Sequence, residues 1–438
     1  MSWLRRYRLR LFFYNSNWLL PVISILVALG TVSLLHRLER AMGWEANVSR
    51  ETALAVMGTI ASSTFSLVVV VSSATLVAVQ LASAQLTPRI ISLVYRIAVR
   101  KFTLVVFVFT FTFSVAVLVR IQGTVPLLTS YLAAYGFLIN LGLFLYMIDF
   151  IGKSLRPSSA LRNVALIGRD VIRSVYPRRL DEKISAATEP IEVLEGQPDH
   201  IVLNSEDGAV LAFDMKGLAA LAERSNCLIE LMPEVGDFVA TGDPLFRVFN
   251  NGQDLAEETL RNSVAIGSER TIEQDPMFVF RIIVDIASKA LSPAINDPTT
   301  AVLAIDQLHH LLRDVGTRYL ADGHEKDRAG EVRLVYRTPN WEDFVQLATT
   351  EIRHYGSDSI QVMRRLRAML DNLIATLPDR RAAALHRELN LLTSSSRRSF
   401  PESDDQKLAE ASDSQGMGGS RGRQPHRKIG RASCRERV

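Results

Sequence analysis

Charged residues are absent from four long segments in the first third of the chain. The longest, Thr52–Pro88, has 37 consecutive residues without Lys, Arg, Asp or Glu. At ~1.5 Å rise per residue, each segment is long enough to cross a hydrocarbon core of ~30 Å. Four such segments exclude a purely water-soluble protein, so we expect an α-helical membrane bundle of four spans. The segments are Leu11–Leu35, Thr52–Pro88, Phe102–Val119 and Ile121–Ile148.

Cysteine is nearly absent as well, with two in 438 residues. Cys434 lies in the final segment, Lys428–Val438, which back-translates to a widely used sequencing adapter, and we interpret this segment as an artefact outside the fold. Cys227 then stands alone, which excludes an internal disulfide and a cysteine-based zinc site. The same segment carries most of the formal charge of +4, so no basic surplus indicates a nucleic-acid partner.

Catalytic and cofactor-binding motifs are missing too. The chain has no Gly-rich phosphate loop, no nucleophile elbow and no His-Glu-x-x-His phrase. His309 and His310 are adjacent, so on a helix they diverge by ~100° and cannot hold a metal together. We therefore predict no enzyme activity, no cofactor and no metal site.

The charged residues near the spans indicate how the chain is oriented in the membrane. Basic residues gather before the first span, after the second and after the fourth, and Lys and Arg concentrate on the cytoplasmic side of membranes. We expect both termini and the polar C-terminal half in the cytoplasm. A cleaved signal peptide ending near Gly30 is the less favoured alternative, because apolar character continues to Leu35. The basic residues are Arg5, Arg6, Arg8 and Arg10, then Arg89, Arg96, Arg100 and Lys101, then Lys153, Arg156 and Arg162.

Polar side chains follow one face of the second span. At ~100° per residue, seven of them fall within one sector of ~120°, in which Val69 and Leu76 are apolar interruptions. Two interpretations remain open. Helix–helix packing is the commoner use of Ser and Thr in membranes, and a water-lined path through an oligomer is the other. The seven residues are Thr59, Ser62, Ser66, Ser73, Gln80, Ser83 and Thr87.

The same helix is too long for a single perpendicular crossing. Ala53–Leu86 would extend ~50 Å, so it must tilt or project beyond the membrane. Pro88 then interrupts it, and Arg89–Lys101 has the pattern of a short amphipathic helix at the membrane interface. Asp149 lies four residues before Lys153, and an ion pair explains it better than a role in a proton-coupled carrier.

Charge is dense after Lys153, which indicates a second fold unit. We expect an α+β domain with a small β-barrel-like part and a helical part. The predicted units are a membrane domain (1–152), a juxtamembrane linker and helix (153–189), a β-rich part (190–250), a helical part (251–392), a disordered tail (393–427) and the adapter-derived end (428–438).

The β-rich part is read from Val, Ile and Leu runs punctuated by Gly, Pro and Asp. Pro190–Asn204 and Cys227–Phe249 carry strand signals, with a helix-like segment Ala212–Arg224 between them. Pro233–Leu245 resembles the tight turns of barrel-sandwich hybrid domains. No Lys occupies the turn that carriers of that type modify, so we expect a small barrel without a swinging arm.

The helical part shows apolar periodicity with clear caps. Asp275–Leu291 is predicted as a helix, and Asp297 as the N-cap of the next, with Pro298 at its first position. Further helices are expected over Trp341–Tyr355, Ile360–Ala375 and Arg380–Leu392. Polar residues crowd around the first two of these helices, either as a ligand or ion site or as caps, turns and ion pairs, of which the second is favoured. They are Arg270, Asp275, Asp285, Asn296, Asp297 and Asp306.

Several phrases in the chain resemble a known family. Glu269–Asp275 (ERTIEQD), Val284–Ala287 (VDIA), Ala290–Ala301 (ALSPAINDPTTA) and Ser83–Arg89 (SAQLTPR) look like the bacterial membrane proteins called domain of unknown function 2254. The resemblance extends to about Leu392. It implies a four-span protein of the bacterial inner membrane with a cytoplasmic domain, and it implies no established activity.

Two functional hypotheses follow. The first is a channel-like homo-oligomer whose second spans line a polar path that the cytoplasmic domains gate or assemble. The second is a membrane-anchored scaffold or sensor whose cytoplasmic domain binds a protein or a small ligand. In both, the lipid bilayer is the one certain partner, and solvent access to the polar face of the second span distinguishes the two.

Overall fold

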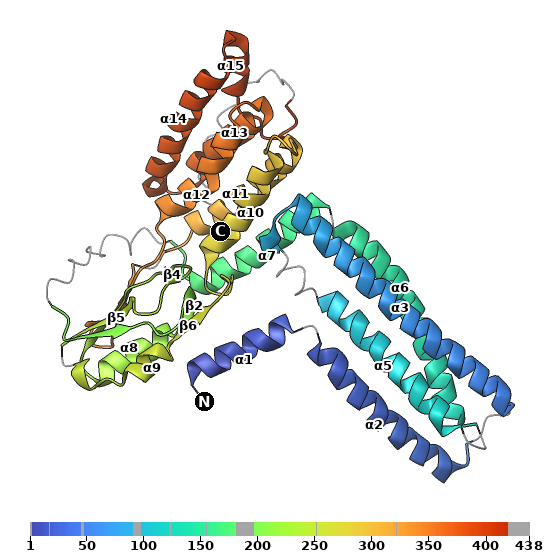
Figure 1. The fold of residues 1–438 in the computed structure, drawn as a ribbon. Helices are drawn as coiled ribbons and strands as arrows, with labels where there is room; N and C mark the ends of the chain where they lie inside the picture. The colour runs from blue at the N-terminus through green and yellow to red at the C-terminus, as the bar shows by residue number, and fades with distance from the viewer. Residues whose placement is uncertain are drawn as a thin grey trace, which may run out of the picture.

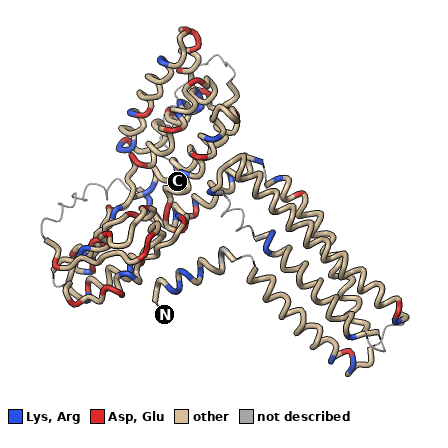
Figure 2. Tube along the Cα trace, viewed as in Figure 1, with Lys and Arg blue, Asp and Glu red and all other residues tan. Residues whose placement is uncertain are grey.

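The computed structural model describes residues 2–16, 18–44, 48–90, 98–121, 125–154, 156–180, 197–250, 252–320 and 322–418. These residues form an elongated bundle of apolar helices and a separate domain of helices and small sheets (Figure 1). Charged residues gather in that domain and at the ends of the bundle, and few occur along the bundle helices (Figure 2). We call the two units the membrane bundle and the C-terminal domain.

The membrane bundle confirms the four predicted spans. Its helices are α2 (Leu19–Met42), α3 (Arg50–Gln85), α5 (Ala98–Arg120) and α6 (Leu127–Ser154), each long and apolar enough to cross a membrane. Helix α5 contacts the other three. Small residues such as Ala28 and Ala133 let the helices approach closely around Phe113. Leu, Val and Phe side chains cover much of the outside, as contact with lipid requires.

Helix α1 (Trp3–Asn15) precedes the bundle and lies beside the C-terminal domain (Figure 1). Arg8 of α1 forms an ion pair of 3.0 Å with Glu206 of that domain. The amino terminus and the C-terminal domain therefore lie at the same end of the bundle. This placement agrees with an even number of crossings.

Helix α7 (Pro157–Val175) leads from the bundle into the C-terminal domain and packs on α10 (Pro276–Ala290) and α11 (Pro298–Gly316). The approach is close at Gly168, where an added Cβ would lie 2.4 Å from a methyl group of Val279. Only a residue without a side chain fits this crossing of α7 and α10.

The helical part is completed by four further helices around one apolar core. Asp275 and Asp297 cap α10 and α11, each accepting a backbone N–H three residues on, which confirms the predicted starts of these helices. The Asn340 capping box likewise starts the next helix where the sequence predicts it. The additional helices are α12 (Trp341–Tyr355), α13 (Ile360–Thr376), α14 (Ala382–Ser399), which follows the 3₁₀ turn η3 (Asp379–Arg381), and α15 (Ser403–Ala409).

Two small sheets form the rest of the C-terminal domain. One has the order β1-β5-β3-β8-β7 and the other β4-β2-β6. Strand β3 runs parallel to β8, with Ile229 opposite Leu334, and the other pairings are antiparallel. The strands are β1 (His200–Leu203), β2 (Gly208–Phe213), β3 (Leu228–Leu231), β4 (Phe238–Val239), β5 (Pro244–Phe249), β6 (Val264–Gly267), β7 (His324–Lys326) and β8 (Val332–Tyr336), with α8 (Met215–Arg224), the 3₁₀ turn η2 (Gly252–Asp254) and α9 (Glu257–Arg261) between them.

The predicted barrel is wrong, since the described strands form two open sheets and close no barrel. The boundary predicted at residue 250 is also crossed, because β6, β7 and β8 come from the segment expected to be helical. Sheet pairing depends on contacts between distant residues, and β8 joins β3 across about a hundred residues of chain. Ala212 and Phe213, expected in a helix, belong to β2.

The predicted disordered tail is wrong over its described part. Helix α14 continues to Ser399 and α15 follows, with Phe400 and Ala409 buried against the helical core. A composition rich in Ser and Arg predicts disorder, but here these side chains make contacts within the fold. Arg397, for example, donates a hydrogen bond of 3.1 Å to Glu410. The predicted interfacial helix Arg89–Lys101 falls largely outside the described residues; η1 (Pro88–Ile90) is a 3₁₀ turn and α5 begins at Ala98.

Candidate functional site: the joint between α3 and the C-terminal domain

Helix α3 runs out of the membrane bundle and into the C-terminal domain. It has 36 residues, and its last turn places Ala82 and Leu86 in the same buried cluster as Leu161 of α7 and Val279 of α10. Leu86 is 2% exposed. The excess length predicted for the second span is therefore used to build the core of the other domain.

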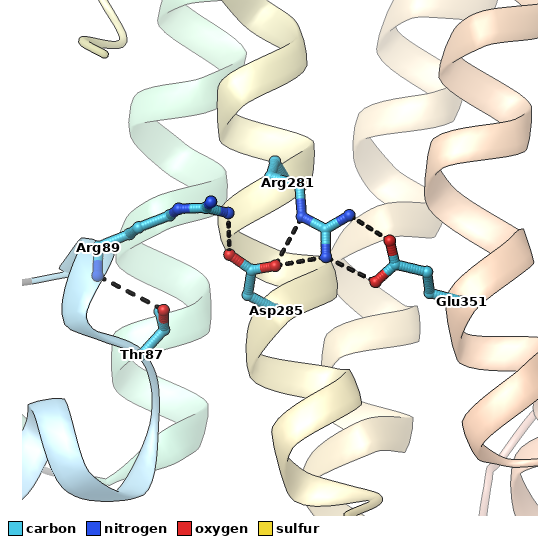
Figure 3. A network of polar contacts seen from close by, with 5 residues as sticks. All are labelled: Thr87, Arg89, Arg281, Asp285 and Glu351. Atoms are coloured by element: carbon cyan, nitrogen blue, oxygen red, sulfur yellow. Dashed lines mark hydrogen bonds and ion pairs between the residues drawn. The ribbon is translucent and has the colours of Figure 1, made fainter. Parts of the chain in front are cut away.

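A chain of ionic contacts surrounds this entry point (Figure 3). The guanidinium of Arg89, just after α3, pairs with the carboxylate of Asp285 on α10. Asp285 also accepts a hydrogen bond of 2.6 Å from Arg281 on the same helix. Arg281 in turn donates two hydrogen bonds, of 2.5 and 2.6 Å, to Glu351 on α12. We call Arg89, Arg281, Asp285 and Glu351 the joint network.

Two further contacts hold the end of α3. The Arg89 N–H donates to the Thr87 hydroxyl oxygen at 3.4 Å, which keeps the turn after the helix compact. Lys289 of α10 donates to the backbone carbonyl of Ser83 at 3.0 Å. Carbonyl groups in the last turn of a helix lack partners within it, and a cation is favoured there by the helix dipole.

The electrostatics of the joint network favour the fully charged state. The hydrogen bonds from Arg281 hold the pKa of Glu351 below its ordinary value, and those to Glu351 raise the pKa of Arg281. Asp285 lies between two guanidinium groups, so it compensates positive charge from both domains at once. The Arg89 guanidinium also lies 6.0 Å from the ring centroid of Phe278.

The polar residues predicted around α10 and α11 do not form one site. Asp275 pairs with Arg270 and caps α10, and burial raises the pKa of Asp275. Asp297 caps α11, after Asn296 with a left-handed φ of 47°. These contacts are the caps and turns that the favoured interpretation expected.

The two remaining aspartates of that predicted set, Asp285 and Asp306, lie in different parts of the structure. Asp306 pairs with Arg365 at 2.7 Å within the helical core. Asp285 alone reaches the membrane bundle, through Arg89. The sequence shows the i,i+4 spacing of Arg281 and Asp285, but nothing in it links either residue to Glu351, which was missed.

The polar face predicted on α3 lies on the outside of the bundle. Thr59, Ser62, Ser66, Ser73 and Gln80 are exposed, whereas Thr87 is buried in the joint and Ser83 is intermediate. Three of the exposed hydroxyls donate to carbonyls of their own helix, among them Ser66 to Ser62 at 3.0 Å. Within one chain, then, this exposed part of the face packs against no other described helix.

Other polar groups, not predicted, lie inside the bundle. Thr64, Thr110, Ser114 and Asn140 are 4% exposed or less, and Thr110 donates to Asn140 at 3.4 Å. Buried polar contacts of this kind hold membrane helices together. At the end of the bundle away from the C-terminal domain, Glu39 accepts the backbone N–H of Thr129 at 2.8 Å. Lys153 pairs with Asp149 at 2.6 Å, which confirms the predicted ion pair. Among the described residues, no group of three or more His, Cys, Asp or Glu could hold a metal ion.

These features define a class: multi-pass α-helical membrane proteins whose C-terminal domain is built directly onto the end of a membrane helix. The chain belongs to the family described as "Predicted membrane protein (DUF2254)", whose model matches residues 14–372. The uncharacterized proteins Rv1290c of Mycobacterium tuberculosis and Mb1321c of Mycobacterium bovis are each 24% identical over 419 residues. The match covers 89% of this chain and 78% of theirs. No solved structure matches the chain.

Proposed function

We propose that the chain forms a channel-like homo-oligomer in the bacterial inner membrane, with α3 of each copy lining a shared polar path. The observation that carries the proposal is the exposed row of Thr59, Ser62, Ser66, Ser73 and Gln80 on α3. Hydroxyl and amide side chains on the outside of one chain are suited to a path between copies, where they would meet water. Both termini and the C-terminal domain are then cytoplasmic, in line with the basic residues at that end.

In this proposal, the contact between α3 and the C-terminal domain gates the path. Because Leu86 and Arg89 fix the end of α3 to the C-terminal domain, a shift of the domain would move the helix that lines the path. A transmission element of this kind needs two rigid bodies in direct contact. The joint network supplies the polar part of that contact and the buried end of α3 supplies the apolar part.

Single-cysteine labelling tests the proposal. A cysteine-free background is made with Cys227→Ser and Cys434→Ser. Ser66→Cys, Ser73→Cys and Gln80→Cys are then labelled in sealed vesicles with a charged, membrane-impermeant thiol reagent. Leu81→Cys is the matched control, since Leu81 is 43% exposed and lies at nearly the same depth as Gln80 but ~100° around the helix from it.

Fast labelling of the polar face, with Leu81→Cys protected, is the expected result. Protein extracted in mild detergent should also run as an oligomer. Protection of all four positions, together with a monomer that passes no ions or small solutes in vesicles, would exclude the channel.

The second candidate function is a membrane-anchored scaffold or sensor. It is favoured by a large polar cleft in the C-terminal domain, described below. In this case α3 transmits ligand binding through the joint without lining a path. The polar face would stay protected while the C-terminal domain still binds a protein or a small ligand. We expect no catalytic activity and no nucleic-acid binding in either case.

A further inference from the structure

A cleft of about 750 Å³ lies between the sheets and the helical part of the C-terminal domain. Its lining includes Glu234 from the turn after β3, Tyr336 at the end of β8, Trp341 at the start of α12, and Arg380 and Arg381 of η3. This volume is within the ~300–1,000 Å³ typical of small-molecule sites. The cleft is separate from the joint network, since no residue of that network lines it.

Arg380 and Arg381 bring two positive charges to one side of the cleft. The Arg381 guanidinium lies 5.2 Å from the Trp341 ring centroid and donates to the Arg318 carbonyl at 3.1 Å. Its Nε atom is buried and has no hydrogen-bond partner in the part of the chain that the structure describes. Neither Arg380 nor Arg381 forms an ion pair with any described residue.

The surroundings of Arg381 disfavour its positive charge, which lowers the pKa of its guanidinium. Burial, with Arg380 nearby, lowers the pKa of Arg381 to about 10, so it stays protonated at neutral pH. A guanidinium whose Nε atom is buried without a hydrogen-bond partner is unfavourable, and an anionic ligand that reaches it would relieve this cost. A guanidinium held against an indole is also pre-oriented, which suits two-point binding of a phosphate.

Carboxylates line the same cleft. Glu234, Asp322, Glu342 and Asp343 are part of its wall, together with a third arginine, Arg337. Burial, with Asp237 nearby, raises the pKa of Glu234. Carboxylates repel a bare polyanion but accept hydrogen bonds from hydroxyl and amino groups. A ligand for this cleft must therefore combine an anionic group with hydrogen-bond donors.

We propose that the cleft binds a small phosphorylated organic molecule, with its phosphate at Arg380 and Arg381 and its hydroxyl or amino groups at Glu234 and Glu342. The shared chemistry is a phosphate on a hydroxylated carrier, as in nucleoside phosphates and sugar phosphates. This site goes beyond the proposed path along α3 and does not depend on it.

The test uses the full-length protein in detergent and isothermal titration calorimetry. Adenosine monophosphate and glucose 6-phosphate are the probes that separate the two sources of the ligand. Inorganic phosphate, adenosine and glucose are the controls for each half of the ligand. At least one phosphorylated probe should bind more tightly than all three controls.

Variants then locate the site. Arg380→Gln removes an exposed charge and Arg381→Gln a partly buried one, and each should weaken binding roughly tenfold or more, as loss of a charged hydrogen bond predicts. Arg387→Gln is the matched control, because Arg387 is exposed on α14 and does not line the cleft. Arg380→Gln keeps the test valid if Arg381→Gln does not fold.

Two results would overturn the proposal. One is the absence of binding of either phosphorylated probe at millimolar concentration. The other is binding that Arg380→Gln weakens no more than Arg387→Gln does. Neither result bears on solvent access to α3, so failure of this site and failure of the proposed path are distinguishable.

Discussion

Asp285 is the residue on which the contact between the two units depends most. Its carboxylate is shared by Arg89, which follows the second span, and Arg281, which is bonded to α12 through Glu351. The Asp285 side chain is 17% exposed, whereas that of Arg89 is 48% exposed. Removing the Asp285 carboxylate should therefore cost more stability than removing the Arg89 guanidinium.

Replacing Asp285 by Asn should destabilise the protein by about 1–3 kcal/mol, because Arg89 loses its carboxylate partner and Arg281 keeps only Glu351. Arg89→Gln should cost under about 1 kcal/mol, as expected for a half-exposed partner. Thermal melting of the purified protein measures both. Asp170→Asn, with an 82% exposed side chain, is the control. Equal melting of the Asp285 and Asp170 variants would show that the network does not stabilise the joint.

The pH dependence of the joint follows from Glu351. Its pKa is depressed in the folded protein from an ordinary value of 4.5, so its contribution is complete above that value and is lost as pH falls through the depressed one. Melting temperature should therefore drop on acidification below about pH 4.5. Glu351→Gln should flatten part of this drop. A variant with the same acid profile as the unmodified protein would contradict this assignment.

Gly168 sets the distance between α7 and α10. Gly168→Ala should destabilise the C-terminal domain by about 1–3 kcal/mol, because the added methyl group overlaps Val279 in a packed core. Gly152→Ala on α6 is the control, since nothing lies within 4 Å of its added Cβ. Circular dichroism melts compare the two. Equal melting temperatures would mean that the helices separate without cost.

At the scale of elements, the features that depend on neighbouring residues were predictable. Uncharged runs located the four spans, apolar periodicity located α10 and α12, and the Asp297-Pro298 cap located the start of α11, because period and capping are local properties. The parallel pairing of Ile229 with Leu334 was not predictable, because it joins strands far apart in the chain. The joint was missed for the same reason, with Arg89 and Asp285 separated by 196 positions.

Helix α15 illustrates how packing overrides composition. A chain ending at Ser399 should lose stability, because it removes Ala409 from the core and the hydrogen bond of 2.6 Å from Gln361 to the Gly416 carbonyl. A chain ending at Gly418 keeps both contacts and is the control. Limited proteolysis with mass spectrometry would show earlier cleavage in α13 and α14 of the shorter chain. Identical digestion patterns would indicate that α15 is dispensable.

At the scale of the whole molecule, the end of one membrane helix belongs to the core of the C-terminal domain. Leu86→Ala should destabilise the C-terminal domain by about 2–5 kcal/mol although the residue directly follows a membrane helix, because the cavity opens inside that domain. Leu81→Ala, on the same helix but 43% exposed, is the control. Hydrogen exchange in α10 reports the effect. Unchanged exchange in the Leu86 variant would mean that the end of α3 is not part of the folding unit.

Helix α3 is continuous over its whole length, so a change in its tilt displaces one end relative to the other. A helix of 36 residues is ~54 Å long at ~1.5 Å per residue, and a change in tilt of about 10° displaces one end by roughly 9 Å relative to the other. Helices whose apolar length exceeds that of the bilayer adjust their tilt to its thickness. The C-terminal end of α3 is fixed in the C-terminal domain. A change in bilayer thickness that tilts α3 should therefore rotate that domain as one rigid body.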